Sequence, residues 1–250
     1  MHLTTDRLTK TFSGVHALSE VDLRVERGEI LGVIGPNGSG KTTLINCISG
    51  VLSPSAGRVL LEGDAISGRR SYRVARAGIA RTFQNVRLFA DMTALENAMV
   101  PASSVRRGGA LKMAREALER LGLSQFESSP VSEVPFPLQR RLEIARAVCL
   151  HPKFLLLDEP AAGLNETESD ELLRTLVDIR DWLECGILLV DHDLRLIMRG
   201  TQRIHVLAEG RTLAEGTPDQ IRRDQRVINA YLGTETADAA PAQTEKGRTP

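Results

Sequence analysis

The chain has 250 residues, and 42% of them are hydrophobic, which suffices for a sizeable core in one large domain or two small ones. Its 32 basic residues balance its 32 acidic ones, so the chain has no net positive charge that would attract nucleic acid or an anionic membrane surface. Three isolated cysteines in apolar surroundings favour buried free thiols and a reducing compartment: Cys47, Cys149 and Cys185. The N-terminal residues contain no apolar signal-peptide core, and the longest apolar runs are too short to cross a bilayer, so we expect any membrane role to come from a partner.

Strands are predicted at the start of the chain. Residues 18–25 place apolar side chains at every second position, which is the pattern of a strand with one buried face. The fully apolar run 30–34 indicates a buried strand, and a helix is expected to begin near Thr43. After a loop at 54–57, residues 58–63 predict another strand.

The pattern becomes helical between residues 90 and 150. Leucine and alanine residues in the segment 111–121 recur at helical spacing, and residues 138–150 predict a second strong helix. We therefore predict a helical subdomain inserted at about residues 90–150.

Strands and helices alternate again after this insertion. The apolar runs 154–157 and 187–190 flank a predicted helix at 166–183. Uninterrupted apolar runs are typical of a parallel sheet that is covered on both faces. Residues 234–250 contain few apolar side chains and many polar and proline residues, so we predict a disordered tail there.

A glycine-rich segment between the strand 30–34 and the following helix carries the strongest chemical signal. It matches the phosphate-loop pattern G-x-x-x-x-G-K-[ST] at every fixed position. Glycines let the backbone turn tightly and present N–H groups to an anion, and the helix N-terminus adds its positive dipole end. A glycine-rich surface turn is the alternative, but it would not require a strand before it and a helix after it. The segment comprises Gly35, Pro36, Asn37, Gly38, Ser39, Gly40, Lys41, Thr42 and Thr43.

The chemistry of this loop predicts a triphosphate and Mg²⁺ as its ligands. Lys41 is expected to reach the β- and γ-phosphates, and the Thr42 hydroxyl is expected to bind Mg²⁺. Asp158 and Glu159 follow the strand 154–157; an acid in this place can hold Mg²⁺ beside the phosphate loop, and the adjacent glutamate can polarise the attacking water. A charged turn after an ordinary strand is the alternative, which the phosphate loop disfavours because a triphosphate site requires both parts.

These motifs, in this order, resemble an ABC-type ATP-binding subunit over about residues 3–233, so we predict one ATP-binding domain at 1–233. Four local strings are similar to the branched-chain amino-acid importer subfamily: the Q-loop region at 81–89 and 92–97, the D-loop at 161–165 and the closing residues 231–233. The resemblance implies an α/β fold with a P-loop NTPase (RecA-like) core and a mostly parallel sheet. It also implies an N-terminal antiparallel β subdomain and an inserted α-helical subdomain.

The resemblance further implies roles for single residues. Gln84 matches the Q-loop glutamine, which senses the γ-phosphate and Mg²⁺ and faces the transmembrane coupling helix. His192 matches the switch histidine, and its place at a strand end suits a γ-phosphate contact. Phe12 stands where the family stacks an aromatic ring on adenine. The alternatives are a polar residue at a strand end, a structural or solvated histidine, and a core aromatic, respectively.

The chain departs from the family at the signature motif, Leu-Ser-Gly-Gly-Gln. Alignment on the helix that follows places residues 134–138 there; we call them the signature segment. Pro135 supplies neither a hydroxyl nor an N–H, and Pro137 removes another N–H. A register that places Gln139 on the signature glutamine still offers no serine and no glycine. Because Pro137 suits the first turn of a helix, we predict a clean helix start with a weakened phosphate contact.

The expected function is that of an ATP-hydrolysing subunit that energises a membrane transporter, an importer of branched-chain or related amino acids. The expected partners are transmembrane permease subunits and a second ATP-binding subunit, with no nucleic acid. A heterodimer is favoured over a homodimer because an intact catalytic set accompanies a damaged signature. The expected location is the cytoplasmic face of the cell membrane, as a peripheral protein.

Three alternatives remain open at this point. The chain is also compatible with an ATPase subunit similar to those of lipopolysaccharide export, with a soluble ABC ATPase outside transport, and with a nucleotide-binding regulator that hardly turns over. A pure binder would not need Glu159 and His192, which disfavours the last of these.

Overall fold

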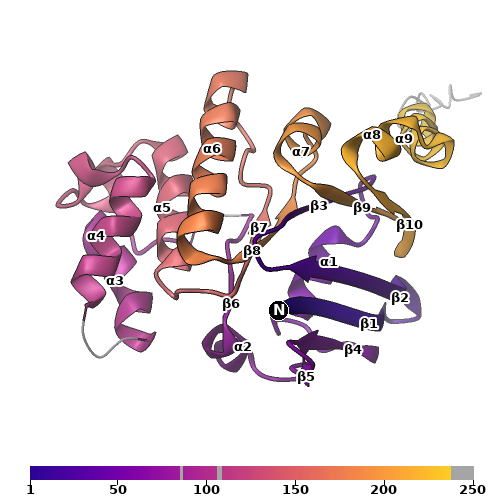
Figure 1. Cartoon of the computed structure of the whole chain (residues 1–250), viewed down its shortest axis with the longest axis horizontal. Helices are drawn as coiled ribbons and strands as arrows, with labels where there is room; N and C mark the ends of the chain where they lie inside the picture. Colours follow the sequence, from indigo (N-terminus) through magenta and orange to yellow (C-terminus); the bar gives the residue numbers. More distant parts are fainter. Residues whose placement is uncertain (85–86, 106–108, 238–250) are drawn as a thin grey trace, which may run out of the picture.

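The computed structural model describes residues 1–84, 87–105 and 109–237, and its centre is a six-stranded sheet (Figure 1). The strand order is β10-β9-β3-β8-β7-β6; β10 is antiparallel to β9, and the other neighbouring strands are parallel. The mostly parallel α/β core predicted from the sequence is therefore confirmed. The strands of this sheet are β3 (Ile30–Ile34), β6 (Ile79–Arg81), β7 (Phe154–Asp158), β8 (Gly186–Val190), β9 (Arg203–Ala208) and β10 (Arg211–Gly216).

A second sheet is antiparallel throughout and has the order β2-β1-β4-β5. It consists mainly of N-terminal residues, as expected for the antiparallel β subdomain, and it packs beside the central sheet. Its strands are β1 (His2–Phe12), β2 (Val15–Glu26), β4 (Ala56–Leu61) and β5 (Asp64–Ala65).

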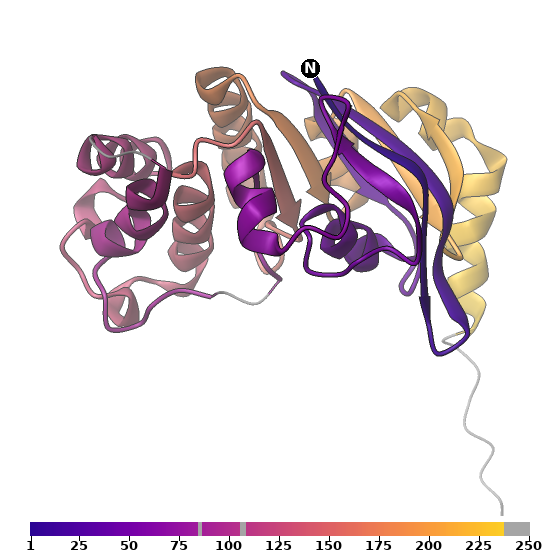
Figure 2. The same ribbon diagram turned by 90° about the horizontal axis from the view of Figure 1, so that it is seen from below.

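The helical subdomain and the antiparallel sheet lie at opposite ends of the molecule, with the central sheet between them (Figure 2). The subdomain contains α3 (Ala94–Val105), α4 (Ala110–Arg120) and α5 (Phe136–Val148), within the insertion predicted at 90–150. The other helices are α1 (Lys41–Ile48), α2 (Ser71–Ala77), α6 (Glu166–Leu183), α7 (Leu194–Gly200), α8 (Pro218–Arg223) and α9 (Gln225–Ala237); short 3₁₀ turns occupy Ser124–Phe126 and Val131–Glu133.

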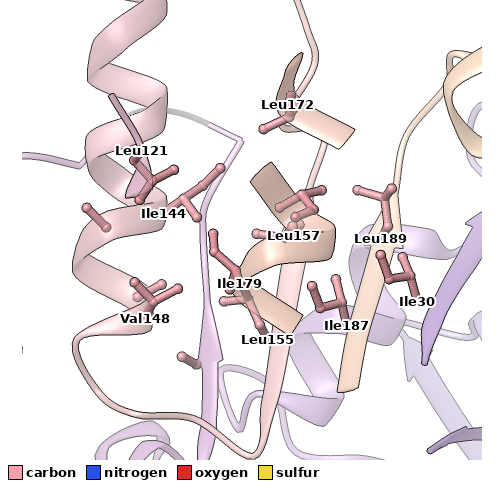
Figure 3. Packing of buried hydrophobic residues seen from close by; sticks show 14 of the residues in the cluster. Ile30, Leu121, Ile144, Val148, Leu155, Leu157, Leu172, Ile179, Ile187 and Leu189 are labelled. Carbon is pink, nitrogen blue, oxygen red and sulfur yellow. The ribbon is translucent and has the colours of Figure 1, made fainter. Parts of the chain in front are cut away.

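The central sheet is buried on both faces. Every residue of β3, β7 and β8 is buried, which explains why these strands are continuous apolar runs rather than alternating ones. On one face, Leu155 and Ile187 pack toward Ile179 of α6 and Val148 of α5 (Figure 3). On the other face, Leu156 and its neighbours pack with α1 and the antiparallel sheet. These two layers hold the C-terminal ends of the parallel strands at one edge.

Local sequence signals set the ends of the helices beside the site. Asn165 caps α6: its side chain accepts from the Glu168 N–H, and the Glu168 carboxylate accepts from the Asn165 N–H in return. Asp193 caps α7 through its carboxylate, which accepts from the Arg195 and Leu196 N–H groups. Helix α5 begins at Phe136 with a proline in its first turn, as the sequence predicts.

Most predicted boundaries lie within two residues of the observed ones. Helix α6 spans the predicted 166–183, whereas α5 begins and ends two residues before the predicted 138–150. The tail predicted at 234–250 is the larger difference, because α9 continues through Ala237. The rest of that prediction, at 238–250, lies outside the described residues.

The three cysteines are buried and free, as predicted. Burial raises the pKa of Cys47 and Cys185 to about 11 and that of Cys149 to about 12. Such thiols remain protonated at neutral pH and behave as small apolar side chains.

Candidate active site

The phosphate loop joins the buried strand β3 to helix α1, in the strand–loop–helix context that the motif requires. Its glycines are needed for close approach of neighbouring backbone. A Cβ on Gly35 would lie 2.1 Å from the Leu207 carbonyl oxygen, and one on Gly40, which has φ +106°, would lie 2.6 Å from the Ala17 oxygen. Side chains at these two positions would displace the loop from the sheet.

Two polar side chains of this loop indicate that it suits a phosphate. The Lys41 Nζ donates to the Gly35 and Pro36 carbonyl oxygens at 2.7 and 3.0 Å, so the ammonium is folded over the loop. Burial lowers the pKa of Lys41, and the carboxylates of Glu159 and Asp158 oppose that shift. The buried Ser39 hydroxyl has no hydrogen-bond partner within the described residues, and an unpaired buried hydroxyl is costly. A nucleotide phosphate fits this donor set.

Asp158 ends strand β7 and is buried, with 3% of its side chain exposed. Burial raises the pKa of this carboxyl, and the nearby Arg81 guanidinium opposes the rise. The Arg81 Nη2 lies 3.6 Å from the Asp158 Oδ2, while its Nη1 donates to Asn46 of α1 and to Ser49, the C-cap of that helix. Arg81 therefore links the carboxylate to the helix that follows the phosphate loop. Asp158 and Thr42 supply carboxylate and hydroxyl oxygens, the ligand type that Mg²⁺ prefers.

Glu159 lies one residue past the strand, in a left-handed conformation with φ +50° that is rare for a glutamate. Its backbone N–H donates to the Val190 carbonyl at 2.8 Å, and its own carbonyl accepts from the Arg140 Nη1 at 3.0 Å. The carboxylate Oε2 accepts from the Gln84 Nε2 at 3.2 Å and lies 3.8 Å from the His192 Nδ1. The structure thus brings the three predicted catalytic side chains together.

His192 is 64% exposed and stands beside the buried Asp191, whose Oδ1 lies 3.5 Å from the His192 Nδ1. Asp191 accepts from the backbone N–H groups of Ala161 and Asp193. Burial raises the pKa of the Asp191 carboxyl, and these two hydrogen bonds oppose the rise. Asp191 therefore connects the histidine to the start of the predicted D-loop.

Phe12 ends strand β1 and is 43% exposed, so its ring is not part of the core. The Lys10 Nζ lies 5.0 Å from the ring centroid. The ring is thus accessible to a ligand, as the predicted adenine contact requires, but its role stays a prediction.

The signature segment contains a buried Val134 followed by Pro135, the N-cap of α5, and Phe136 is 60% exposed. The Gln139 side chain donates back to the Val131 and Val134 carbonyls at 3.3 and 2.9 Å. The alternative register therefore offers a glutamine that is already engaged within its own segment.

Four side chains at the site were not singled out by the sequence patterns. Arg81 belongs to the segment that predicted the Q-loop, and Asp191 precedes the predicted switch histidine. Arg140 belongs to the helix on which the signature segment was aligned. Tyr231 belongs to the closing string; burial raises its pKa to about 12, opposed by a hydrogen bond with the Gly35 backbone. A charged or polar residue beside a motif is too common a pattern to predict such contacts.

Within residues 1–84, 87–105 and 109–237, no helix is long and apolar enough to cross a membrane. The same residues contain no cluster of three or more His, Cys, Asp or Glu side chains that could hold a metal ion. A Mg²⁺ ion held by one carboxylate, one hydroxyl, phosphates and water does not need such a cluster.

Two family models match the chain. The model described as ABC transporter matches residues 18–162, and the one described as branched-chain amino acid ATP-binding cassette transporter matches residues 211–237. The chain therefore belongs to the ABC transporter family, and the resemblance inferred from its motifs is confirmed. The C-terminal match places it beside the branched-chain amino-acid cassettes within that family.

Curated relatives agree with this assignment. The high-affinity branched-chain amino acid transport ATP-binding proteins BraF of Pseudomonas aeruginosa and LivG of Escherichia coli are each 40% identical over 248 residues, which covers 92% of this chain and 97% of theirs. The lipopolysaccharide export system ATP-binding protein LptB of Haemophilus influenzae is 32% identical over 235 residues.

Solved structures share the fold. The ADP conformation of MJ1267, an ATP-binding cassette of an ABC transporter, matches with a TM-score of 0.85 and 28% identity over 93% of this chain and 99% of that one. A dimeric post-hydrolysis state of the cassette MJ0796, bound to ADP and Pi, matches with a TM-score of 0.79 and 26% identity over 86% and 98%. The names of both structures mention ADP, in agreement with a family that binds nucleotides.

Proposed function

We propose that this chain hydrolyses ATP as the nucleotide-binding subunit of an importer for branched-chain or related amino acids. The observation that carries the proposal is the convergence of Gln84, Glu159 and His192 at one edge of the sheet. The C-terminal match at residues 211–237 and the two relatives at 40% identity support the amino-acid class over lipopolysaccharide export. Balanced charge gives no support to a nucleic-acid partner.

Each side chain has a distinct role in this proposal. Lys41 and the loop from Gly35 to Gly40 hold the β- and γ-phosphates, and Phe12 stacks on the adenine. Thr42, Asp158 and Gln84 would hold Mg²⁺, and the bound ion would neutralise the charge that develops on the phosphate oxygens. Glu159 orients a water for attack on the γ-phosphorus and accepts its proton, while His192 contacts the γ-phosphate. The P–O bond to ADP breaks as the new bond forms.

A second ATP-binding chain completes the site in this proposal. ABC cassettes form dimers, as the MJ0796 structure shows for that protein. The heterodimer is favoured because Pro135 and Pro137 remove donors that a partner's γ-phosphate would need, whereas this chain's own catalytic set is intact. The partner would contribute a complete signature motif to the nucleotide held by Lys41 of this chain. The permease subunits, contacted through the Gln84 region, would hold the chain at the cytoplasmic face of the membrane.

The replacement Glu159→Gln tests the catalytic assignment. It retains the size of the side chain and removes the carboxylate that accepts the proton, so we expect ATP to bind normally and hydrolysis to fall by at least about a hundredfold. Binding is measured with a fluorescent ATP analogue, and turnover by phosphate release, on the complex that co-purifies with the tagged chain from membranes. Glu166→Gln, on the exposed first turn of α6, is the matched control. Undiminished turnover in Glu159→Gln would refute the assignment.

The identity of the co-purifying proteins tests the transport assignment. We expect a second ATPase, two permeases and a binding protein for amino acids. Recovery of nucleic acid, or of the chain without any membrane protein, would favour the soluble ATPase class instead.

A further inference from the structure

Helix α5 contacts the catalytic region of its own chain. It begins at the signature segment, and its Arg140 reaches across to the end of β7, where the Nη1 donates to the Glu159 carbonyl oxygen at 3.0 Å. The Arg140 Nε is buried and has no hydrogen-bond partner within the described residues, and the Phe136 ring lies 5.7 Å from the guanidinium carbon. Among the described residues, the Glu159 carbonyl is therefore the hydrogen-bond acceptor that holds this guanidinium in place.

Hydrogen bonds with Val190, Ala162 and Arg140 hold the backbone of Glu159. Its φ of +50° is a backbone conformation that residues other than glycine rarely adopt, so neighbouring contacts must maintain it. The Val190 carbonyl accepts from the Glu159 N–H at 2.8 Å. The Glu159 carbonyl accepts from the Arg140 Nη1 at 3.0 Å and, more weakly, from the Ala162 N–H at 3.3 Å, so Arg140 supplies the shorter of its two hydrogen bonds and the one that comes from another element. This conformation sets the direction in which the carboxylate points, toward Gln84 and His192.

We propose that Arg140 is a positioning residue for Glu159, through which the helical subdomain controls the catalytic base of its own chain. The proposal rests on the proposed function of Glu159. The signature segment at the start of α5 acts, by its family role, on the partner's nucleotide, and here it lacks the donors for that task. Arg140, two residues after the segment, instead acts on the catalytic site of its own chain. Rotation of α5 away from the sheet edge would withdraw the Arg140 donor and leave the Glu159 carbonyl with only the longer hydrogen bond from the Ala162 N–H.

A neighbouring arginine provides a matched control. Arg141 lies on the same helix and ion-pairs with Glu171 of α6 at 2.9 Å, away from Glu159. Loss of Arg141 would weaken the anchoring of α5 to the core without removing a contact to the catalytic residues. A purely structural role for Arg140 would therefore give the same kinetic result as the loss of Arg141.

The kinetic test compares Arg140→Met, Arg140→Lys and Arg141→Met in the complex that co-purifies with the tagged chain. Loss of one hydrogen bond from a charged donor corresponds to roughly a tenfold change or more. We expect Arg140→Met to lower kcat by about tenfold and to leave KM for ATP within about twofold. Arg140→Lys should recover part of kcat because the ammonium retains a donor, and Arg141→Met should leave kcat within about twofold. Equal kcat values in Arg140→Met and Arg141→Met, or a change confined to KM, would overturn the proposal.

Amide hydrogen exchange on the isolated chain provides a second readout. We expect faster exchange in the peptide containing residues 158–162 in Arg140→Met, and unchanged exchange there in Arg141→Met. Unchanged exchange in Arg140→Met would refute the positioning role even if the complex were inactive. A wild-type complex without ATPase activity would instead refute the proposed function, so the two failures can be told apart.

Discussion

Arg81 offers the sharpest test of the electrostatics beneath the site. Its side chain is 9% exposed and that of Asp158 is 3% exposed, with the Nη2 and Oδ2 atoms 3.6 Å apart. Burial lowers the pKa of Arg81 and raises that of Asp158, so desolvation opposes the charged form of both groups. The mutual attraction of the pair, and the Arg81 hydrogen bonds to Asn46 and Ser49, offset this cost.

The replacement Arg81→Met removes the guanidinium and leaves the buried Asp158 carboxyl without its ion-pair partner. Breaking a buried pair in this way costs about 3–5 kcal/mol of unfolding free energy. Because Arg81 lowers the pKa of Asp158, that pKa rises further in the variant. The stabilisation from the pair is present while Asp158 is ionised, and it is lost as the pH falls and Asp158 becomes protonated. The difference between wild type and variant is therefore expected to be largest near neutral pH and smaller in acid.

Urea unfolding of the nucleotide-free chain at pH 7 and at about pH 4.5 measures this difference. Arg87→Met is the control, because Arg87 and Arg81 contact the same aromatic ring. Their guanidinium carbons lie 4.1 and 4.3 Å, respectively, from the centroid of the Phe83 ring. Loss of an exposed contact of this kind costs about 0.5–1 kcal/mol. The reasoning fails if Arg81→Met costs no more than Arg87→Met, or if its cost does not shrink in acid.

Two further predictions concern burial and close approach. The cysteine pKa values of about 11 and about 12 in the folded chain exceed the unfolded value of 9.0, so the unfolding free energy should fall as the pH rises above 9. Removal of one such thiol in Cys149→Ala should make the plot of unfolding free energy against pH shallower by up to about 1.4 kcal/mol per pH unit. Parallel plots would contradict this. Gly35→Ala places a Cβ 2.1 Å from the Leu207 oxygen and should weaken binding of a fluorescent ATP analogue by at least about tenfold, whereas Gly63→Ala, with open space around its Cβ, should not. Equal affinities in the two variants would show that the close approach at Gly35 is unimportant.

The parts of the fold that depend on short-range patterns were predictable. Continuous apolar runs predicted β3, β7 and β8 because a strand covered on both faces has no polar side. Helix α6 was predicted at its observed bounds, and it has a capping box at its start and a left-handed Glu184 at its end. The start of the tail was predicted at residue 234, whereas α9 continues through Ala237, since the polar composition of residues 234–237 does not prevent a helix.

Contacts between distant segments were not predictable in the same way. Arg140 meets Glu159 across 19 positions, Asp191 meets Ala161 across 30, and Arg81 meets Asn46 across 35. Each contact depends on where α5 and the strands lie in space rather than on the residues next to it in sequence. The missing signature donors, by contrast, were evident from Pro135 and Pro137 alone, because proline has no N–H in any fold.

The sequence by itself determined which chemical groups this protein can bring to a nucleotide: the N–H groups and lysine of the phosphate loop, the strand-end carboxylates and a histidine. It did so because each motif consists of residues close together in the chain. The tertiary structure alone decided how these groups meet. Gln84 and Glu159 are 75 positions apart, and the neighbouring places of β6 and β7 in the sheet bring them within 3.2 Å. Strand order and helix packing, which no local pattern specifies, set that distance and the reach of Arg140 to the catalytic base.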